Sequence, residues 1–523
     1  MDSILLGSTR DGAPQRLPLA KANRHGLIAG ATGTGKTVTV QGLIEGFSAA
    51  GVPCFVADVK GDLSGLAVAG SPGGKLHAAF AERARAVGDM GWSYRDTPVQ
   101  FWDLYGEQGH PIRTTVSEMG PLLLARLLGL NETQGGVLAI AFYLADEEGL
   151  LLLDLDDLQA MLAECAARAP ELSATLGNVS KQSVGAIQRA LLQLRAQGGD
   201  GFFGEPALDL RDFIAHAEDG RGVVNILAAD KLVAAPKLYA TFLLWLLSEL
   251  WETLPEIGDP DRPVLVFVFD EAHLLFDDAP PALTEKVEQV VRLIRSKGVG
   301  VYFVTQNPLD VPDGVGAQLG HRVQHALRAF TPRERAAVRA AATSFRADPS
   351  VDVETAITEL ATGEALVSLL QPDGAPSPVR RTLIRPPASR VGPVTPPERR
   401  VLIDTDAIGS RYDVRIDRDS AHEILTGKAD AAARAAADAR AEADVARTAA
   451  ARAKADRAAE RERARLEREE ANAPLARMTR GATAAVGRQI ASEISRQVFG
   501  RSAGGRIGGA IVRGILGGLF RGR

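Results

Sequence analysis

The sequence predicts an α/β fold with a mainly parallel sheet covered by helices, and two observations support this prediction. Short apolar runs of four to eight residues recur from Gly26 to about residue 384, and most are rich in Val, Ile and Phe, as doubly buried parallel strands are. Helical patterns lie between several of these runs, and such alternation builds a parallel sheet. We expect strands at Gly26–Ala29, Cys54–Ala57, Val99–Asp103, Val223–Leu227, Val264–Phe269 and Val299–Thr305, and helices at Leu238–Leu254 and Leu283–Lys297.

Composition excludes several classes of protein. The chain has 523 residues, a length that suggests about three to four domains. Of these residues 46% are hydrophobic and 24% charged, which is typical of globular proteins. The two cysteines, Cys54 and Cys165, are too few for a disulfide framework and suit a reducing compartment. No run reaches the roughly 18 apolar residues that span a bilayer, and the first residues do not resemble a secretory signal. We therefore expect a cytoplasmic protein.

The pattern also predicts how the chain is divided. A core is expected over 1–385, with a mostly helical insertion at about 111–213. Five prolines indicate a stiff linker at 386–400, and a small β or capping element is expected at 401–425. Residues 426–472 are rich in Ala, Arg and Glu and predict a helix with few apolar heptad positions, which favours a solvated helix over a coiled coil.

The charge is distributed unevenly along the chain. The tail predicted at 473–523 carries nine arginines against Glu493 alone, which gives it a net charge of +8. Since the whole chain has a net charge of −5, the remainder has a net charge of −13. An acidic body argues against a surface covered by nucleic-acid-binding charge, and leaves a local basic tail or an electropositive channel. The tail is rich in glycine and also holds isoleucines at near-helical spacing. We expect a flexible or partly helical end, and the alternative is an amphipathic helix on an anionic membrane or on DNA.

The strongest motif is a phosphate loop, G-x-x-x-x-G-K-[ST], between the first predicted strand and a helix. In such a loop the glycine backbone wraps the phosphates and the helix N-terminus presents N–H groups to them. Lys36 is expected to reach the β- and γ-phosphates, and the Thr37 hydroxyl to bind Mg²⁺. The residues predicted to bind the nucleotide are Gly30, Ala31, Thr32, Gly33, Thr34, Gly35, Lys36 and Thr37.

A second motif places two carboxylates at the end of the strand predicted at Val264–Phe269. Ligands of open parallel sheets bind at that edge, so we expect Asp270 to orient Mg²⁺ and Glu271 to polarise the attacking water. The alternative is that the pair only caps the next helix. No Asn-Lys-x-Asp guanine-reading motif occurs, which favours ATP over GTP.

Together these segments resemble the HerA/FtsK group of ring-forming ATPases, and most closely the bacterial helicase HerA-like C-terminal domain proteins. The resemblance covers roughly residues 1–385 and implies a RecA-like P-loop NTPase core. Its matching pieces are Arg24–Gly30, the phosphate loop, Val56–Asp62, Val223–Asp230, the acidic pair and Leu293–Pro308.

The resemblance also implies roles for single residues. Gln306 would sense the γ-phosphate, although a glutamine at a strand end can serve only as a hydrogen-bonding group. Arg295 would enter the site of the neighbouring subunit as an arginine finger, or else be a surface arginine. Arg24 would be a second arginine acting in its own subunit. The roles of Asp58 and Lys60 at the end of the second strand are left open.

The function implied is an ATP-driven homohexameric ring that uses ATP and Mg²⁺ and moves DNA, with sequence-independent contacts to phosphates. A protein-handling ATPase of the secretion or conjugation type is one alternative, and a nucleotide-dependent scaffold is another. Only about 25 residues precede the first predicted strand, too few for the barrel by which HerA docks a nuclease. The nuclease partnership of HerA is therefore not carried over to this chain, and no protein partner can be assigned.

Overall fold

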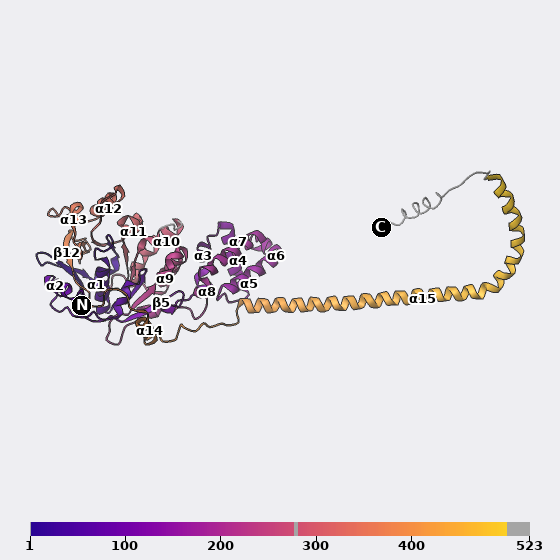
Figure 1. Cartoon of the computed structure of the whole chain (residues 1–523), viewed down its shortest axis with the longest axis horizontal. Coiled ribbons are helices and arrows are strands. Elements are labelled where there is room, and N and C mark those ends of the chain that lie inside the picture. The colour runs from indigo at the N-terminus through magenta and orange to yellow at the C-terminus, as the bar shows by residue number, and fades with distance from the viewer. Residues whose placement is uncertain (1, 277–280, 499–523) are drawn as a thin grey trace. The chain divides into compact units, whose positions relative to one another are not determined.

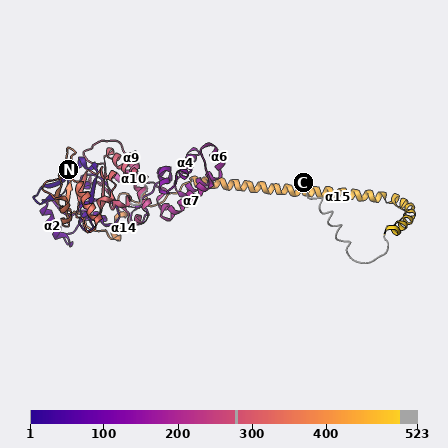
Figure 2. The same ribbon diagram turned by 90° about the horizontal axis from the view of Figure 1, so that it is seen from above.

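The computed structural model describes residues 2–276 and 281–498 (Figures 1 and 2). The chain consists of a compact unit, Met1–Lys428, and a second unit, Ala429–Arg523. The compact unit holds a 12-stranded sheet in the order β2-β1-β12-β11-β10-β3-β9-β8-β4-β7-β5-β6. The predicted α/β class is therefore confirmed.

The strands from β10 to β6 in this order are parallel. They are β10 (His321–Gln324), β3 (Gly26–Ala29), β9 (Val299–Thr305), β8 (Leu265–Phe269), β4 (Cys54–Asp58), β7 (Val224–Ala228), β5 (Val99–Asp103) and β6 (His110–Pro111). All six predicted strands are among them, each within one residue of its predicted ends. The strands β2 (Pro14–Pro18), β1 (Ser3–Thr9), β12 (Arg380–Ile384) and β11 (Glu364–Ser368) add an antiparallel edge. Sequence analysis missed this edge, because β2 and β12 carry exposed polar residues instead of a continuous apolar run.

Alternate residues of the central strands face two different cores, which explains why these strands are apolar throughout. Val266 and Val268 of β8 belong to a core shared with α1 (Lys36–Ala49). Their neighbours Leu265, Phe267 and Phe269 belong to a core on the other face, which is covered by α9 (Pro236–Thr253) and α10 (Pro281–Ile294). The sheet is therefore buried on both faces.

The predicted helical insertion lies between β6 and β7 in the chain. It consists of α3 (Val116–Leu127), α4 (Glu132–Glu147), α5 (Leu155–Ala167), α6 (Ala169–Thr175), α7 (Lys181–Ala196) and α8 (Gly199–Phe202), grouped beside the sheet in both views (Figures 1 and 2). Capping boxes begin α3, α4 and α5, where Thr115, Asn131 and Asp154 accept hydrogen bonds from the backbone of the first turn. The remaining helices of the core are α2 (His77–Ala86), α11 (Asp313–Gly316), α12 (Pro332–Thr343) and α13 (Val353–Glu359).

Residues 385–420, which we call the strap, follow β12 and differ from the predicted linker and small element. The backbone N–H groups of Ala388 and Ser389 donate to the buried Glu45 carboxylate on α1, so the proline-rich stretch packs against the core. A helix, α14 (Pro396–Asp404), crosses the predicted boundary at residue 400. Two of the five prolines that suggested a linker, Pro396 and Pro397, lie in its first turn, where proline is well tolerated, and Thr395 caps it with Glu398.

The predicted charged helix is confirmed as part of α15 (Ala421–Val498), which begins earlier and ends later than the expected 426–472. Side chains from Ala429 to Ala471 are exposed, as expected for a solvated helix. Residues 499–523 of the predicted tail lie outside the described part of the chain. Within the described ranges, no helix has an apolar stretch long enough to cross a bilayer.

Candidate nucleotide-binding site

The sequence motifs meet at one edge of the sheet because their strands are parallel. The phosphate loop follows β3, the acidic pair follows β8, and Gln306 follows β9, which lies between those two strands. Asp58 ends β4, the next strand beyond β8. This is the carboxyl edge, where open α/β sheets bind their ligands.

The phosphate loop has a backbone that requires glycine. Gly33 and Gly35 have φ angles of +79° and +106°, a left-handed conformation that other residues rarely adopt. A Cβ atom at Gly30 would come within 2.5 Å of the Cβ of His325. The loop borders a cavity of about 350 Å³ that Lys36 and Thr37 help to line. The volume and the donors of this cavity fit a polyphosphate.

Lys36 lies inside the loop. Its Nζ atom donates hydrogen bonds to the carbonyl oxygen of Gly30 and, at 3.2 Å, to that of Ala31. Burial, together with the nearby charge of Lys60, lowers the pKa of Lys36 from its ordinary value. A buried ammonium group that donates to neutral carbonyl oxygens is suited to bind the more negative oxygens of a phosphate chain.

A chain of hydrogen bonds joins the phosphate loop to Glu271. Thr32 Oγ1 donates to Gln306 Oε1 at 3.2 Å, and Gln306 Nε2 donates to Glu271 Oε1 at 3.0 Å. Lys60 forms an ion pair with the same Oε1 atom. Burial would raise the pKa of Glu271, but the hydrogen bonds from Lys60 and Gln306 outweigh it and lower that pKa, so Glu271 is ionised near neutral pH. Glu271 has φ 48° and ψ 55°, a left-handed backbone that costs energy in a non-glycine residue and is typical of functional sites.

Three carboxylates gather beside this network. Oxygen atoms of Asp58, Asp62 and Asp270 all lie within 4.8 Å of one another, and Thr37 Oγ1 donates to Asp62 Oδ2 at 3.2 Å. Burial and the neighbouring carboxylates raise the pKa of Asp58 to about 7, and burial and Glu271 raise that of Asp270 to about 6. A cluster of hard oxygen donors that repel one another fits a divalent cation such as Mg²⁺. Sequence analysis did not single out Asp62, although its position four residues after Asp58 was a signal.

The structure does not bring the two predicted arginines to the phosphate loop of their own subunit. Arg24 precedes β3 and Arg295 precedes β9, so both lie at the amino edge of the sheet, opposite the loop. Arg24 pairs there with Asp259 at 2.6 Å, and Asn23 Nδ2 donates to the Arg295 carbonyl oxygen at 3.3 Å. The length of β3 separates Arg24 from the loop, which disagrees with the expectation that it acts within its own subunit.

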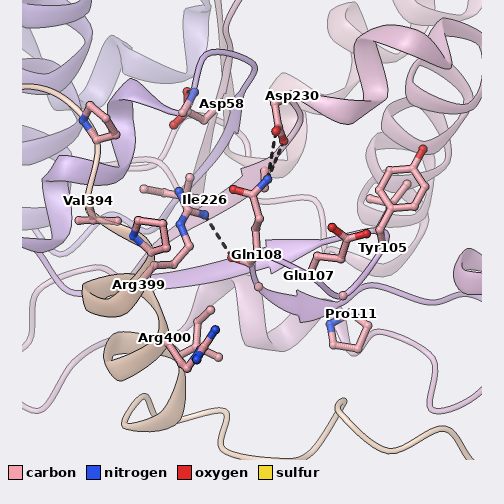
Figure 3. Close-up of a pocket in the computed structure, with 18 of the residues that line it drawn as sticks. Asp58, Tyr105, Glu107, Gln108, Pro111, Ile226, Asp230, Val394, Arg399 and Arg400 are labelled. Atoms are coloured by element: carbon pink, nitrogen blue, oxygen red, sulfur yellow. Dashed lines mark hydrogen bonds between the residues drawn. The ribbon is translucent and has the colours of Figure 1, made fainter.

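A second cavity, of about 810 Å³, opens along the same edge beyond β4 (Figure 3). Its lining includes Asp58 and Lys60, residues near the ends of β5 and β7, and α14 of the strap. Gln108 Nε2 donates a hydrogen bond to the Asp230 carboxylate at 3.0 Å, and Arg399 donates one to the Gln108 carbonyl oxygen at 3.1 Å (Figure 3). Gln108 thus joins two polar residues of its lining, Asp230 and Arg399, and the phosphate loop lies outside this cavity.

Comparisons with known proteins show which family and which solved structures the chain is similar to. A family model described as helicase HerA-like C-terminal matches residues 3–523. Among solved structures, VirB4 of Thermoanaerobacter pseudethanolicus is 17% identical over 76% of this chain and 98% of its own, with a TM-score of 0.48. The bacterial conjugative coupling protein TrwBdeltaN70 is 16% identical over 75% of this chain and 91% of its own, with a TM-score of 0.45. The cytoplasmic domain of the type VII secretion ATPase EccC of Thermomonospora curvata is 17% identical over 80% of this chain and 33% of its own, with a TM-score of 0.29. No curated protein matches the chain.

Proposed function

Since this chain belongs to the helicase HerA-like C-terminal family of P-loop ATPases, we propose that it hydrolyses ATP with Mg²⁺ as a homohexameric ring that moves DNA. The observation that carries the hydrolytic part is the hydrogen-bond chain from Thr32 through Gln306 to Glu271. It connects the loop that would hold the phosphates to the carboxylate that would act on water. A helix-capping role alone would not require this link.

The roles of the residues follow from their chemistry. The loop N–H groups and Lys36 bind the phosphate oxygens, and Gln306 lies between the loop and Glu271, where it can respond to the γ-phosphate. Thr37, Asp62 and Asp270 would hold Mg²⁺, which screens the charge of the phosphates. Glu271, ionised and hydrogen-bonded, accepts a hydrogen bond from the attacking water and orients it toward phosphorus.

Arg295 supports a ring. Because it lies at the amino edge, it can reach a nucleotide only in another subunit, where it would stabilise charge on the transferred group. Each site would then be incomplete in a monomer. Mixing Arg295→Ala with Lys36→Ala subunits should restore part of the hydrolysis that each variant lacks alone. No recovery in any mixture would assign Arg295 a structural role.

DNA is the proposed substrate because such a ring can grip phosphates in its channel without reading sequence. The test is steady-state ATP hydrolysis with and without duplex DNA, at low and high salt, with Glu271→Gln as the blank. Stimulation by DNA that weakens at high salt is the expected result. Hydrolysis indifferent to DNA would keep the ATPase and favour the protein-handling alternative, while hydrolysis as fast in Glu271→Gln would contradict the catalytic assignment.

A further inference from the structure

The two carboxylate oxygens of Glu271 have different surroundings. Oε1 accepts from Gln306 Nε2 at 3.0 Å and pairs with the Lys60 ammonium group. Oε2 is buried, and among the described residues it has no hydrogen-bond partner, although His273 Nδ1 lies 3.3 Å away. A buried carboxylate oxygen is costly without a hydrogen bond, so Oε2 is the Glu271 atom suited to accept one from a water molecule.

We propose that Lys60 is a positioning residue for ATP hydrolysis: with Gln306 it holds Oε1 of Glu271, so that Oε2 is presented to the attacking water. This inference rests on the proposed function, because it presumes that Glu271 orients that water. It gives a role to a residue whose sequence context left it open. Lys60 itself does not touch the reacting atoms in this assignment, but acts through Glu271.

The turn that carries Lys60 is built to hold its side chain in place. It follows β4, which pairs directly with β8, the strand that ends at Glu271. The Asp58 carboxylate accepts from the N–H groups of Gly61 at 2.8 Å and Leu63 at 3.1 Å, and Gly61 takes the left-handed φ of +75° that closes the turn. Lys60 thus projects from a fixed backbone toward the next strand end.

Glu271 also needs such a restraint. Its backbone is left-handed, so its side chain leaves the strand end in a direction that ordinary extended backbone would not give. The Lys60 ion pair and the Gln306 hydrogen bond fix that direction from two sides. The Glu271 side chain is 6% exposed and that of Lys60 43%, and Lys60 lines both cavities. A displacement of about 1 Å in a catalytic group can cost about 100-fold in rate.

The experiment compares three variants in the full chain. Lys60→Met removes the ammonium group but keeps most of the stem, and Lys60→Arg restores a donor and a charge. Lys231→Met is the matched control, because Lys231 is another half-exposed lysine at this sheet edge, paired with Glu107. Steady-state kinetics give kcat and KM for ATP, and thermal unfolding reports folding.

We expect Lys60→Met to lower kcat by about 10- to 100-fold while KM changes by less than about threefold. Lys60→Arg should recover most of kcat, and Lys231→Met should behave as wild type. A structural role would instead lower the melting temperature, and an ATP-binding role would raise KM with kcat retained. Either result, or a higher kcat in Lys60→Met, would overturn the inference.

The proposed function fails separately, if wild type does not hydrolyse ATP or if Glu271→Gln matches it. The positioning role fails alone when wild type and Glu271→Gln behave as expected and Lys60→Met retains its kcat. If Lys60→Met does not fold, Lys60→Gln replaces it with a neutral donor, for which the same loss of kcat at constant KM is expected.

Discussion

Asp62 is the residue of the acidic cluster that is joined most directly to the phosphate loop. It accepts a hydrogen bond from Thr37 Oγ1, and its carboxylate oxygens lie within 4.8 Å of those of Asp58 and Asp270. We expect Asp62→Asn to raise the Mg²⁺ concentration for half-maximal hydrolysis by about 10-fold, since partners of metal-binding groups commonly contribute 10- to 100-fold in affinity.

A Mg²⁺ titration of the ATPase rate measures this effect. Asp146→Asn on α4 is the control, because Asp146 is exposed on the helical insertion. An unchanged Mg²⁺ requirement in Asp62→Asn, together with a normal rate, would remove Asp62 from the metal site.

Whether a residue of the site could be predicted depends on whether its role follows from local sequence or from the order of the strands. The phosphate loop and the pair Asp270–Glu271 need only local spacing and a strand before them, and both are visible in the sequence. The Lys60–Glu271 ion pair forms between the ends of β4 and β8, and it depends on those strands being neighbours. Strand order is a property of the whole sheet, so one sequence did not reveal the partner of Lys60.

At the scale of elements, the strap is anchored to α1 by one buried carboxylate. Glu45 is 4% exposed and accepts from the N–H groups of Ala388 and Ser389 and from Ser389 Oγ. We expect Glu45→Gln to lower the free energy of unfolding by about 2–3 kcal/mol, because an amide cannot accept all these hydrogen bonds and brings a donor toward other donors. Urea unfolding measures the loss, with the exposed Glu82→Gln on α2 as the control. Equal midpoints in the two variants would contradict the anchor.

A second anchor of the strap is sensitive to pH. His110 is buried, with Nδ1 2.9 Å from Asp413 Oδ1 and Nε2 3.1 Å from Asp406 Oδ2. Burial would lower the pKa of His110, but the hydrogen bonds to Asp406 and Asp413 outweigh it and raise that pKa above the ordinary 6.5. The charged imidazolium therefore stabilises the fold fully below about pH 6.5, and this contribution is lost as the pH rises through the raised pKa.

We expect the difference in unfolding free energy between wild type and His110→Gln to shrink as the pH rises. His110→Gln should lose about 1–3 kcal/mol of unfolding free energy in mild acid, and less as the solution becomes alkaline. Urea unfolding between about pH 5.5 and 9 measures the difference, with the exposed His422→Gln as the control. A gap that widens toward high pH would show that the imidazole is not held as a cation.

The strap also shows what composition cannot predict about an element. Proline content indicates a stiff, extended chain, whereas the segment before α14 has an irregular backbone with bends. Its partners, however, lie far away in the sequence: Glu45 is 343 positions from Ala388, and His110 is 296 positions from Asp406. A pattern within the segment does not encode such contacts, and so a packed strap was predicted to be a linker.

At the scale of the whole molecule, the boundary at Lys428 predicts which truncations the fold tolerates. Side chains from Ala429 to Ala471 are exposed, whereas Ala421 and Leu425 at the start of α15 belong to the core of the compact unit. The Asp157 carboxylate is fully buried and accepts two hydrogen bonds from this region. Ser420 Oγ donates to it at 2.5 Å, and the backbone N–H of His422 donates to it at 2.8 Å. The compact unit thus ends within α15 and not before it.

We therefore expect residues 1–428 to unfold within about 2 °C of the full chain, because the described side chains that the truncation removes, those from Ala429 to Ala471, are exposed. A chain ending at residue 419 should lose about 3–5 kcal/mol, since it uncovers the apolar surface under Ala421 and Leu425 and leaves a buried carboxylate short of two donors. Thermal and urea unfolding of the two truncations measure both effects. If the 1–428 chain were as unstable as the shorter one, the second unit would contribute to the stability of the first. If the 419 chain were as stable as the full chain, the first turns of α15 would not belong to the core.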